Sequence, residues 1–246
     1  MPYLLEGNQL HKSFGGLMAV NGVDFYLEPG EILGLIGPNG SGKTTLFNLI
    51  AGVFKPDRGR IKFEGKDITG TGCAAVCQLG IARTFQITRP FPFLTVLQNV
   101  QLGRAYGSNP AKTLEQTQIE ADEILQFIGL NSKRKVLAGR LGVIDRKRLE
   151  LGKALATKPK ILLLDEIMAG LNPTEVLAAT DLVKRIRESG VSLIVIEHMM
   201  KAIMGICHRV IVLNAGRKIA EGVPQEVILD RGVIEAFLGE DQDAED

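Results

Sequence analysis

One short run of small and polar residues has the most specific chemistry in this chain. Residues 37–45 read Gly-Pro-Asn-Gly-Ser-Gly-Lys-Thr-Thr, which matches the pattern G-x-x-x-x-G-K-[ST] in register. Glycines let several backbone N–H groups converge on one point, because side chains would block the approach and some positions need positive φ. Lys43 can place its ammonium group against the β- and γ-phosphates, and the Thr44 hydroxyl can ligate Mg²⁺. The residues predicted to hold the nucleotide here are Asn39, Gly40, Ser41, Gly42, Lys43, Thr44 and Thr45.

The residues on either side of this loop predict the elements that position it. Residues 31–36 form an apolar run of strand length, and Leu46, Leu49 and Ile50 follow with helical spacing. A strand, a glycine loop and a helix in this order aim a helix N-terminus at phosphate. The alternative, a glycine-rich turn without a ligand, is disfavoured by this context.

A pair of acidic residues follows a second apolar run. Asp165 and Glu166 come directly after residues 161–164, Ile-Leu-Leu-Leu. Carboxylates at the C-terminal end of a buried strand lie where open α/β sheets bind ligands. We expect Asp165 to hold Mg²⁺ and Glu166 to polarise the water that attacks the γ-phosphate. An acidic pair that opens a surface turn is the alternative, and the phosphate loop favours the functional interpretation.

Three further side chains have weaker signals that depend on the two motifs above. His198 follows the apolar run 191–196 and fits a sensor of the γ-phosphate, although an isolated histidine there is more often structural. Gln86 can reach Mg²⁺ or the attacking water, or it can be an exposed side chain at a strand end. Phe14 offers an aromatic face to adenine, and the alternative is a core phenylalanine.

Composition limits the remaining possibilities. The chain has 246 residues, 45% of them hydrophobic, and a net charge of +1, so we expect an ordered domain and no nucleic-acid partner. No run approaches the ~20 apolar residues of a spanning helix, and residues 1–6 lack the features of a signal peptide, which predicts a soluble cytosolic protein. Cys73 and Cys77 are expected to be small buried side chains rather than zinc ligands.

The pattern along the chain predicts an α/β fold. Strands are expected within residues 3–36 and a hairpin at 59–68, whereas helical spacing dominates the segment 87–157. Short, fully apolar runs at 161–164 and 191–196 are typical of buried parallel strands, and a helix at 174–188 lies between them. A β-rich stretch at 209–221 then precedes short helices.

In order and spacing, these motifs resemble the nucleotide-binding subunit of ABC transporters. The resemblance covers nearly the whole chain, and it implies ATP and Mg²⁺ as ligands, with Val20 among the nucleotide contacts. It also implies a P-loop NTPase (RecA-like) core with a mixed sheet, an N-terminal antiparallel β subdomain and an inserted α-helical subdomain. Residues 1–246 would form a single ATPase domain, with 1–86 and 158–246 as the core and 87–157 as the helical subdomain.

Several segments are similar to the ATPase of branched-chain amino acid importers in particular. These segments are residues 14–20, 81–86, 169–175 and 220–224. This likeness implies a peripheral subunit at the cytoplasmic face of the membrane that powers import through separate membrane-spanning permease subunits, supplied by a solute-binding protein. The strip 90–94, Pro-Phe-Pro-Phe-Leu, could line the groove that receives a membrane subunit, or it could be an internal packing loop.

One segment departs from the family pattern. The family's signature, Leu-Ser-Gly-Gly-Gln, aligns with Leu141, Gly142, Val143, Ile144 and Asp145. In the family this segment begins a helix and grips the γ-phosphate bound by the opposite subunit. Here the hydroxyl is absent, two β-branched residues disfavour close backbone approach, and a carboxylate is added. We therefore expect a weakened site on the partner's ATP and favour a heterodimer over a homodimer, unless the helix start still contacts phosphate through its backbone N–H groups.

Two other functions remain open at this stage. A non-transport ABC ATPase of repair or translation usually has two cassettes or a long coiled-coil insertion, and neither pattern is seen in this sequence. A nucleotide-dependent regulator with little turnover would fit the altered signature, but it would not need the predicted base Glu166.

Overall fold

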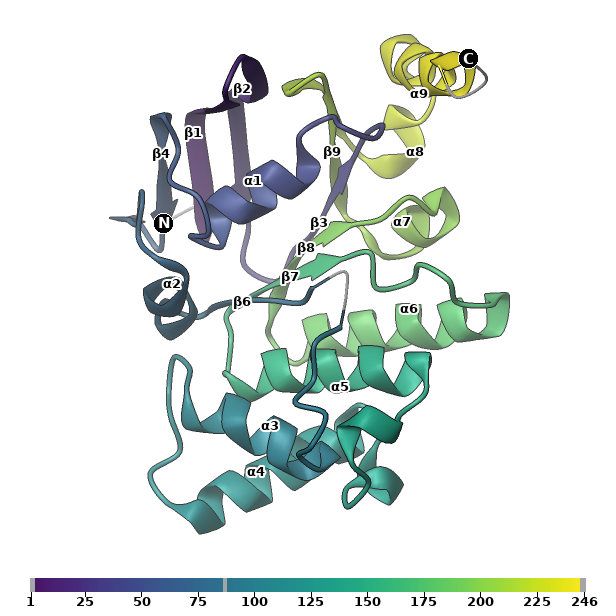
Figure 1. Ribbon diagram of the computed structural model, residues 1–246. Coiled ribbons are helices and arrows are strands. Elements are labelled where there is room, and N and C mark those ends of the chain that lie inside the picture. Colours follow the sequence, from purple (N-terminus) through teal and green to yellow (C-terminus); the bar gives the residue numbers. More distant parts are fainter. Residues whose placement is uncertain (1–2, 86–87, 244–246) are drawn as a thin grey trace.

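The computed structural model describes residues 3–85 and 88–243 (Figure 1). Within these ranges the strands form a four-stranded sheet in the order β2-β1-β4-β5 and a six-stranded sheet in the order β10-β9-β3-β8-β7-β6. The four-stranded sheet comprises β1 (Leu5–Phe14), β2 (Leu17–Leu27), β4 (Arg58–Phe63) and β5 (Lys66–Asp67). The six-stranded sheet comprises β3 (Ile32–Ile36), β6 (Ile81–Arg83), β7 (Ile161–Asp165), β8 (Ser192–Ile196), β9 (Arg209–Asn214) and β10 (Arg217–Gly222).

The central parallel strands of the six-stranded sheet are buried on both faces, whereas its edge strand β10 is exposed or partly buried. Strands β3, β6, β7, β8 and β9 run parallel, and β10 pairs antiparallel with β9. Because side chains alternate along a strand, Leu163 of β7 packs in the cluster that contains α1 (Lys43–Ile50), whereas Leu162 and Leu164 pack toward α6 (Pro173–Glu188). This two-sided burial explains why these strands read as continuous apolar runs, and it confirms the α/β fold class.

Helix α1 lies between the two sheets (Figure 1). Its Leu46 and Phe47 share one hydrophobic cluster with Val23 of β2, Ile61 of β4 and Leu35 of β3. The antiparallel sheet therefore covers the face of α1 that the central sheet leaves open, and it holds the start of α1 at the edge of both sheets.

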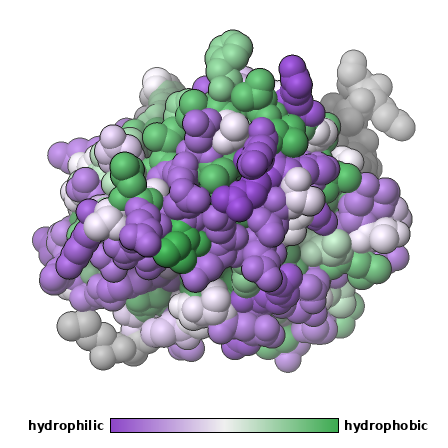
Figure 2. Space-filling view, turned by 90° about the horizontal axis from the view of Figure 1, so that it is seen from below, coloured by the Kyte–Doolittle hydropathy of each residue, from purple (hydrophilic) through white to green (hydrophobic). Residues whose placement is uncertain are grey.

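A group of helices occupies the lower part of Figure 1. It contains α3 (Val96–Ala105), α4 (Leu114–Phe127) and α5 (Val143–Ala156), which surround their own hydrophobic cluster, while Leu151 of α5 packs with α6 against the central sheet. Figure 2, which views the molecule from below, shows hydrophobic side chains scattered over a mostly hydrophilic surface. The remaining helices are α2 (Cys73–Leu79), the 3₁₀ turns η1 (Asn131–Lys133) and η2 (Ala138–Arg140), α7 (Met200–Ile206), α8 (Pro224–Val227) and α9 (Arg231–Asp243).

Across residues 3–85 and 88–243, no helix combines the length and the apolar character that crossing a bilayer requires.

One expectation about packing was wrong. Cys73 is exposed and Cys77 is only partly buried. Both lie on α2, a seven-residue helix whose buried side chain is Val76, so this helix is too short to bury the cysteines as well.

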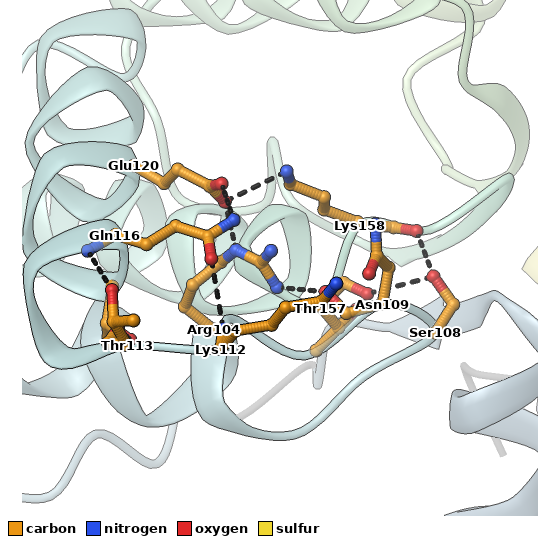
Figure 3. A network of polar contacts seen from close by, with 10 residues as sticks. Arg104, Ser108, Asn109, Lys112, Thr113, Gln116, Glu120, Thr157 and Lys158 are labelled. Atoms are coloured by element: carbon orange, nitrogen blue, oxygen red, sulfur yellow. Dashed lines mark hydrogen bonds and ion pairs between the residues drawn. The ribbon is translucent and has the colours of Figure 1, made fainter.

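A buried arginine ties the helical group together (Figure 3). Arg104 of α3 has no exposed surface, and its guanidinium donates to the carboxylate of Glu120 on α4 and to the carbonyl of Asn109. Lys158, just after α5, forms an ion pair of 2.9 Å with the same carboxylate, and Gln116 donates to it at 2.8 Å. The hydrogen bond from Arg104, reinforced by Lys158 and Gln116, lowers the pKa of Glu120 to about 2 despite its partial burial.

The Glu120 network predicts a pH-dependent contribution to stability. Glu120→Gln should lower the free energy of unfolding at pH 7 by roughly 1.5–3 kcal/mol, because it weakens charge-assisted hydrogen bonds to a buried arginine. Since the pKa of Glu120 in the folded state is about 2, below its ordinary value of 4.5, the stabilisation is present above pH 4.5 and is lost as the pH falls toward 2. Urea unfolding of both proteins from pH 7 to pH 3 should show a shrinking difference.

The exposed Glu123 on the same helix provides the control. Glu123→Gln should change the unfolding free energy by less than about 0.5 kcal/mol. A difference between wild type and Glu120→Gln that stays constant down to pH 3 would contradict the role given to the ionised carboxylate.

Candidate functional site

The phosphate-binding pattern forms a tight loop between β3 and α1. Two of its glycines have backbone angles that side chains rarely adopt, with φ of 143° at Gly37 and 103° at Gly42. A Cβ atom at Gly37 would lie 2.0 Å from the carbonyl oxygen of Leu213, and one at Gly42 would lie 2.3 Å from that of Ala19. The loop is thus wedged between β2 and the end of β9, and only glycine fits at these two positions.

Lys43 opens α1 and folds back over the loop. Its Nζ atom donates to the carbonyl oxygens of Gly37 and Pro38, both at 2.7 Å, and the residue is 6% exposed. The ammonium group is therefore held at the centre of the loop. Around it, Asn39, Gly40 and Thr44 are exposed to solvent, as a surface for a phosphate chain requires.

The predicted metal ligand Asp165 is buried at the end of β7. Its Oδ2 atom accepts a hydrogen bond of 2.9 Å from Arg83, which ends the neighbouring strand β6, and the residue is 4% exposed. The same guanidinium donates to the side-chain carbonyl of Asn48 on α1. A buried carboxylate needs such a partner, because desolvation of an isolated charge is costly.

Glu166, one residue after β7, and His198, two residues after β8, meet beyond the ends of these strands. The Nε2 atom of His198 lies 2.9 Å from Oε1 of Glu166, and the side chains are 43% and 20% exposed, respectively. Glu166 has a φ of 49°, which is uncommon for a residue with a side chain, and its N–H donates to the carbonyl of Ile196 at 3.0 Å. Unusual backbone angles of this kind cluster at functional sites.

The strand order brings these groups together. Strands β3, β8, β7 and β6 are consecutive neighbours and run parallel, so their C-terminal ends share one edge of the sheet. The phosphate loop, His198, the Asp165–Glu166 pair and Arg83 follow or end these strands. Ligand sites in α/β sheets occur at this edge.

Two predicted nucleotide contacts from the N-terminal sheet differ in exposure. Phe14, at the end of β1, is 43% exposed and meets Phe54 edge to face, so its ring has free surface for a base. Val20 has no exposed surface and packs in the hydrophobic core. A direct contact between Val20 and a nucleotide is therefore not available in this structure, since the alternation along β2 turns this side chain inward.

The divergent segment lies away from the phosphate loop, with α5 in the lower half of Figure 1 and α1 in the upper half. Gly142 caps the start of α5 with an extended backbone and no side-chain cap, and Val143 is 65% exposed. Leu141 is buried, and the Asp145 carboxylate pairs with Lys133 rather than standing alone. Ile144 lines a cleft of about 680 Å³ between the start of α5 and α6.

The comparisons with known proteins agree with this geometry. Residues 20–169 match the family described as ABC transporter. The chain is 38% identical to the high-affinity branched-chain amino acid transport ATP-binding protein LivG of Escherichia coli, over 96% of this chain and 98% of that protein. The chain belongs to the ATP-binding cassette family of ABC transporters. Its membership makes this cassette an ATPase whose hydrolysis of ATP is coupled to transport.

Further similarities concern a subfamily and solved structures. Residues 217–243 of the cassette match the branched-chain amino acid ATP-binding cassette transporter family, and BraF of Pseudomonas aeruginosa is 35% identical over 96% of this chain and 98% of its own. The crystal structure of the ADP conformation of MJ1267, an ATP-binding cassette of an ABC transporter, has a TM-score of 0.89 at 34% identity, covering 98% of this chain and 100% of that one. These similarities confirm the P-loop NTPase fold.

One residue of this site was not predicted from the sequence, and one predicted residue lies outside the described ranges. Arg83 contacts the predicted metal ligand, and its only sequence signal is its place at the end of a short strand, three residues before Gln86. Gln86 itself lies outside the described residues, so its role stays a prediction.

The two loop glycines Gly40 and Gly42 predict different tolerances to a side chain. Both have positive φ, but a Cβ at Gly40 has nothing within 4 Å, whereas one at Gly42 meets the Ala19 carbonyl. Gly42→Ala should therefore lower the free energy of unfolding by about 1–3 kcal/mol more than Gly40→Ala. Urea unfolding without nucleotide measures both, and equal losses would contradict the wedged position of the loop.

Proposed function

We propose that this cassette hydrolyses ATP to drive uptake of branched-chain amino acids, or chemically similar solutes, at the cytoplasmic face of the cell membrane. The observation that carries the proposal is the contact of 2.9 Å between Glu166 and His198, at the sheet edge that also bears the phosphate loop. A base and a polar partner at that edge suit the attack of water on a terminal phosphate. The similarity to LivG and BraF supports the choice of solute.

Each side chain of the site has its own proposed role in binding or hydrolysing ATP. Lys43 and the backbone N–H groups of the loop bind the phosphates, and Phe14 stacks on the base. Glu166 polarises the attacking water, and His198, hydrogen-bonded to Glu166, contacts the γ-phosphate. Gln86 is proposed to link this water to the neighbouring helical segment.

Thr44 and Asp165 are the residues that would hold Mg²⁺. Hydroxyl and carboxylate oxygens are the donors that this ion prefers, and they lie at the start of α1 and the end of β7. Arg83 donates to Oδ2 of Asp165 and holds this carboxylate at the end of β7. When bound, Mg²⁺ neutralises charge on the phosphates.

The site is proposed to be completed by a second ATPase subunit. The signature of that subunit would cover the ATP bound here, whereas the altered residues 141–145 would cover the partner's ATP less well. We favour a heterodimer for this reason. Residues 87–157 are proposed to act as a helical subdomain that moves with ATP binding against the core, residues 1–86 and 158–246.

Transmembrane permease subunits, supplied by a solute-binding protein, are the other proposed partners. A cleft of about 410 Å³ opens beside α3. Its apolar lining includes Phe85, Phe91, Leu102 and Tyr106, and charged side chains such as Glu150 and Lys153 also line it. Phe91 of the strip 90–94 is 51% exposed, and Phe93 of the same strip is 89% exposed. Exposed aromatic side chains around a cleft fit a helix of a membrane subunit.

Glu166→Gln tests the proposed chemistry. In the assembled transporter this change should lower ATP hydrolysis by about 100-fold or more, because a general base contributes 10²–10⁴-fold, while ATP affinity stays within roughly threefold. Steady-state hydrolysis and equilibrium binding measure the two effects. Glu188→Gln, an exposed carboxylate on α6, is the control that should retain wild-type turnover. Undiminished hydrolysis by Glu166→Gln would refute the assignment of the base.

Phe91→Asp tests the proposed groove. Placing a charge in an apolar contact should weaken association with the membrane subunits roughly tenfold or more. The measurement is the amount of membrane subunit that co-purifies with the tagged cassette. Leu114→Asp is the matched control, since Leu114 is 89% exposed at the start of α4 and does not line this cleft. Equal recovery with Phe91→Asp and wild type would contradict the groove as the docking site.

A further inference from the structure

The proposed base Glu166 begins a segment of four residues, 166–169, that follows β7. Glu166 leaves the sheet with a φ of 49°, and the chain then passes through Ile167, Met168 and Ala169 before the turn that Asn172 caps at α6. Ile167 and Met168 are buried, whereas the Glu166 side chain keeps 20% of its surface exposed. A shift of this segment would therefore move the carboxylate that faces His198.

Two charged side chains from other elements hold this segment. Lys147 of α5 donates from Nζ to the carbonyl oxygens of Ile167 at 3.1 Å and Ala169 at 2.5 Å. Glu197, one residue after β8, accepts the N–H of Met168 at 2.8 Å. Successive backbone groups of the segment are thus bound from both sides by opposite charges.

The surroundings of these two side chains shift the pKa of each. Glu197 is 3% exposed, and burial raises its pKa, an effect that the Met168 N–H and the charge of Lys147 oppose. Burial also lowers the pKa of Lys147, which the charges of Glu197 and Glu166 oppose. A buried charge is stable only where hydrogen bonds satisfy it, so Glu197 needs the Met168 N–H, and the partly buried Lys147 is stabilised by the two carbonyl groups.

Lys147 also belongs to the start of the helix that bears the divergent segment. It lies three residues after Ile144, hence about one turn along α5, and both residues line the cleft of about 680 Å³ between α5 and α6. Movement of the first turns of α5 would therefore pull on the carbonyl groups of Ile167 and Ala169.

We propose that Lys147 is a positioning residue that fixes the segment Glu166–Ala169, and through it the Glu166 carboxylate, to the start of α5. This inference rests on the proposed role of Glu166 as the base. It assigns to α5 an effect on the ATP bound by its own chain, in addition to the effect on the partner's ATP. Lys147 does not itself touch the nucleotide in this account.

Hydrogen exchange of the backbone tests the positioning without reference to turnover. In the assembled transporter, Lys147→Met should speed amide exchange of the segment 166–171 by about tenfold or more, because its carbonyl groups lose their partner. Lys147→Arg, which retains a cation able to reach carbonyl oxygens, should restore most of the protection. The control is Lys184→Met, which changes an exposed lysine on α6 and should leave amide exchange of the segment 166–171 at the wild-type rate. Wild-type protection in Lys147→Met would overturn the inference, whatever the activity.

Kinetics then separate positioning from a purely structural role. Lys147→Met should lower kcat for ATP by about 10- to 100-fold, the effect of a misplacement of about 1 Å, while the KM for ATP stays within roughly threefold. Lys147→Arg should recover most of the loss. Faster exchange with an unchanged kcat would also overturn the inference. The proposed function is judged separately by Glu166→Gln, so failure of one account is distinguishable from failure of the other.

Discussion

The chemistry of this cassette depends on the parallel alignment of four neighbouring strands, β3, β8, β7 and β6. Because these strands point the same way, the loop or side chains at each C-terminal end reach the same edge. The strands can be packed so closely only because their side chains are apolar on both faces, with α1 on one side and α6 on the other. A polar residue within these strands would disturb the core and the site together.

Charges at that edge are held by hydrogen bonds or ion pairs within the protein itself. Lys43 is bound by loop carbonyls, Asp165 by Arg83, and Glu197 by the Met168 N–H with Lys147 nearby. Such pairing offsets the cost of burial, and it keeps the groups in place for a ligand that brings phosphates. The resulting site is preorganised, since the backbone of the loop and of Glu166 already adopts unusual positive φ values.

The parts that sequence predicted well are those in which a local pattern determines a local structure. The glycine loop, the apolar strands at 161–164 and 191–196 and the helix at 174–188 are present close to their predicted bounds. The parts that it missed depend on contacts between distant segments. The pairing of Arg83 with Asp165 joins residues 82 positions apart, and Lys147 reaches carbonyl groups 20 and 22 positions away. The burial of Val20 and the exposure of Cys73 likewise follow from how whole elements pack.

We propose that the loop, Asp165, Glu166 and His198 form one half of an ATPase site, which a second subunit completes. The most direct measurement is the ATP hydrolysis rate of the purified chain alone, over a range of protein concentrations, and again with the proposed second ATPase subunit added. The account predicts little turnover by the chain alone and a steep rise when the partner is added. Full turnover by the isolated chain, independent of its concentration and of the partner, would contradict it.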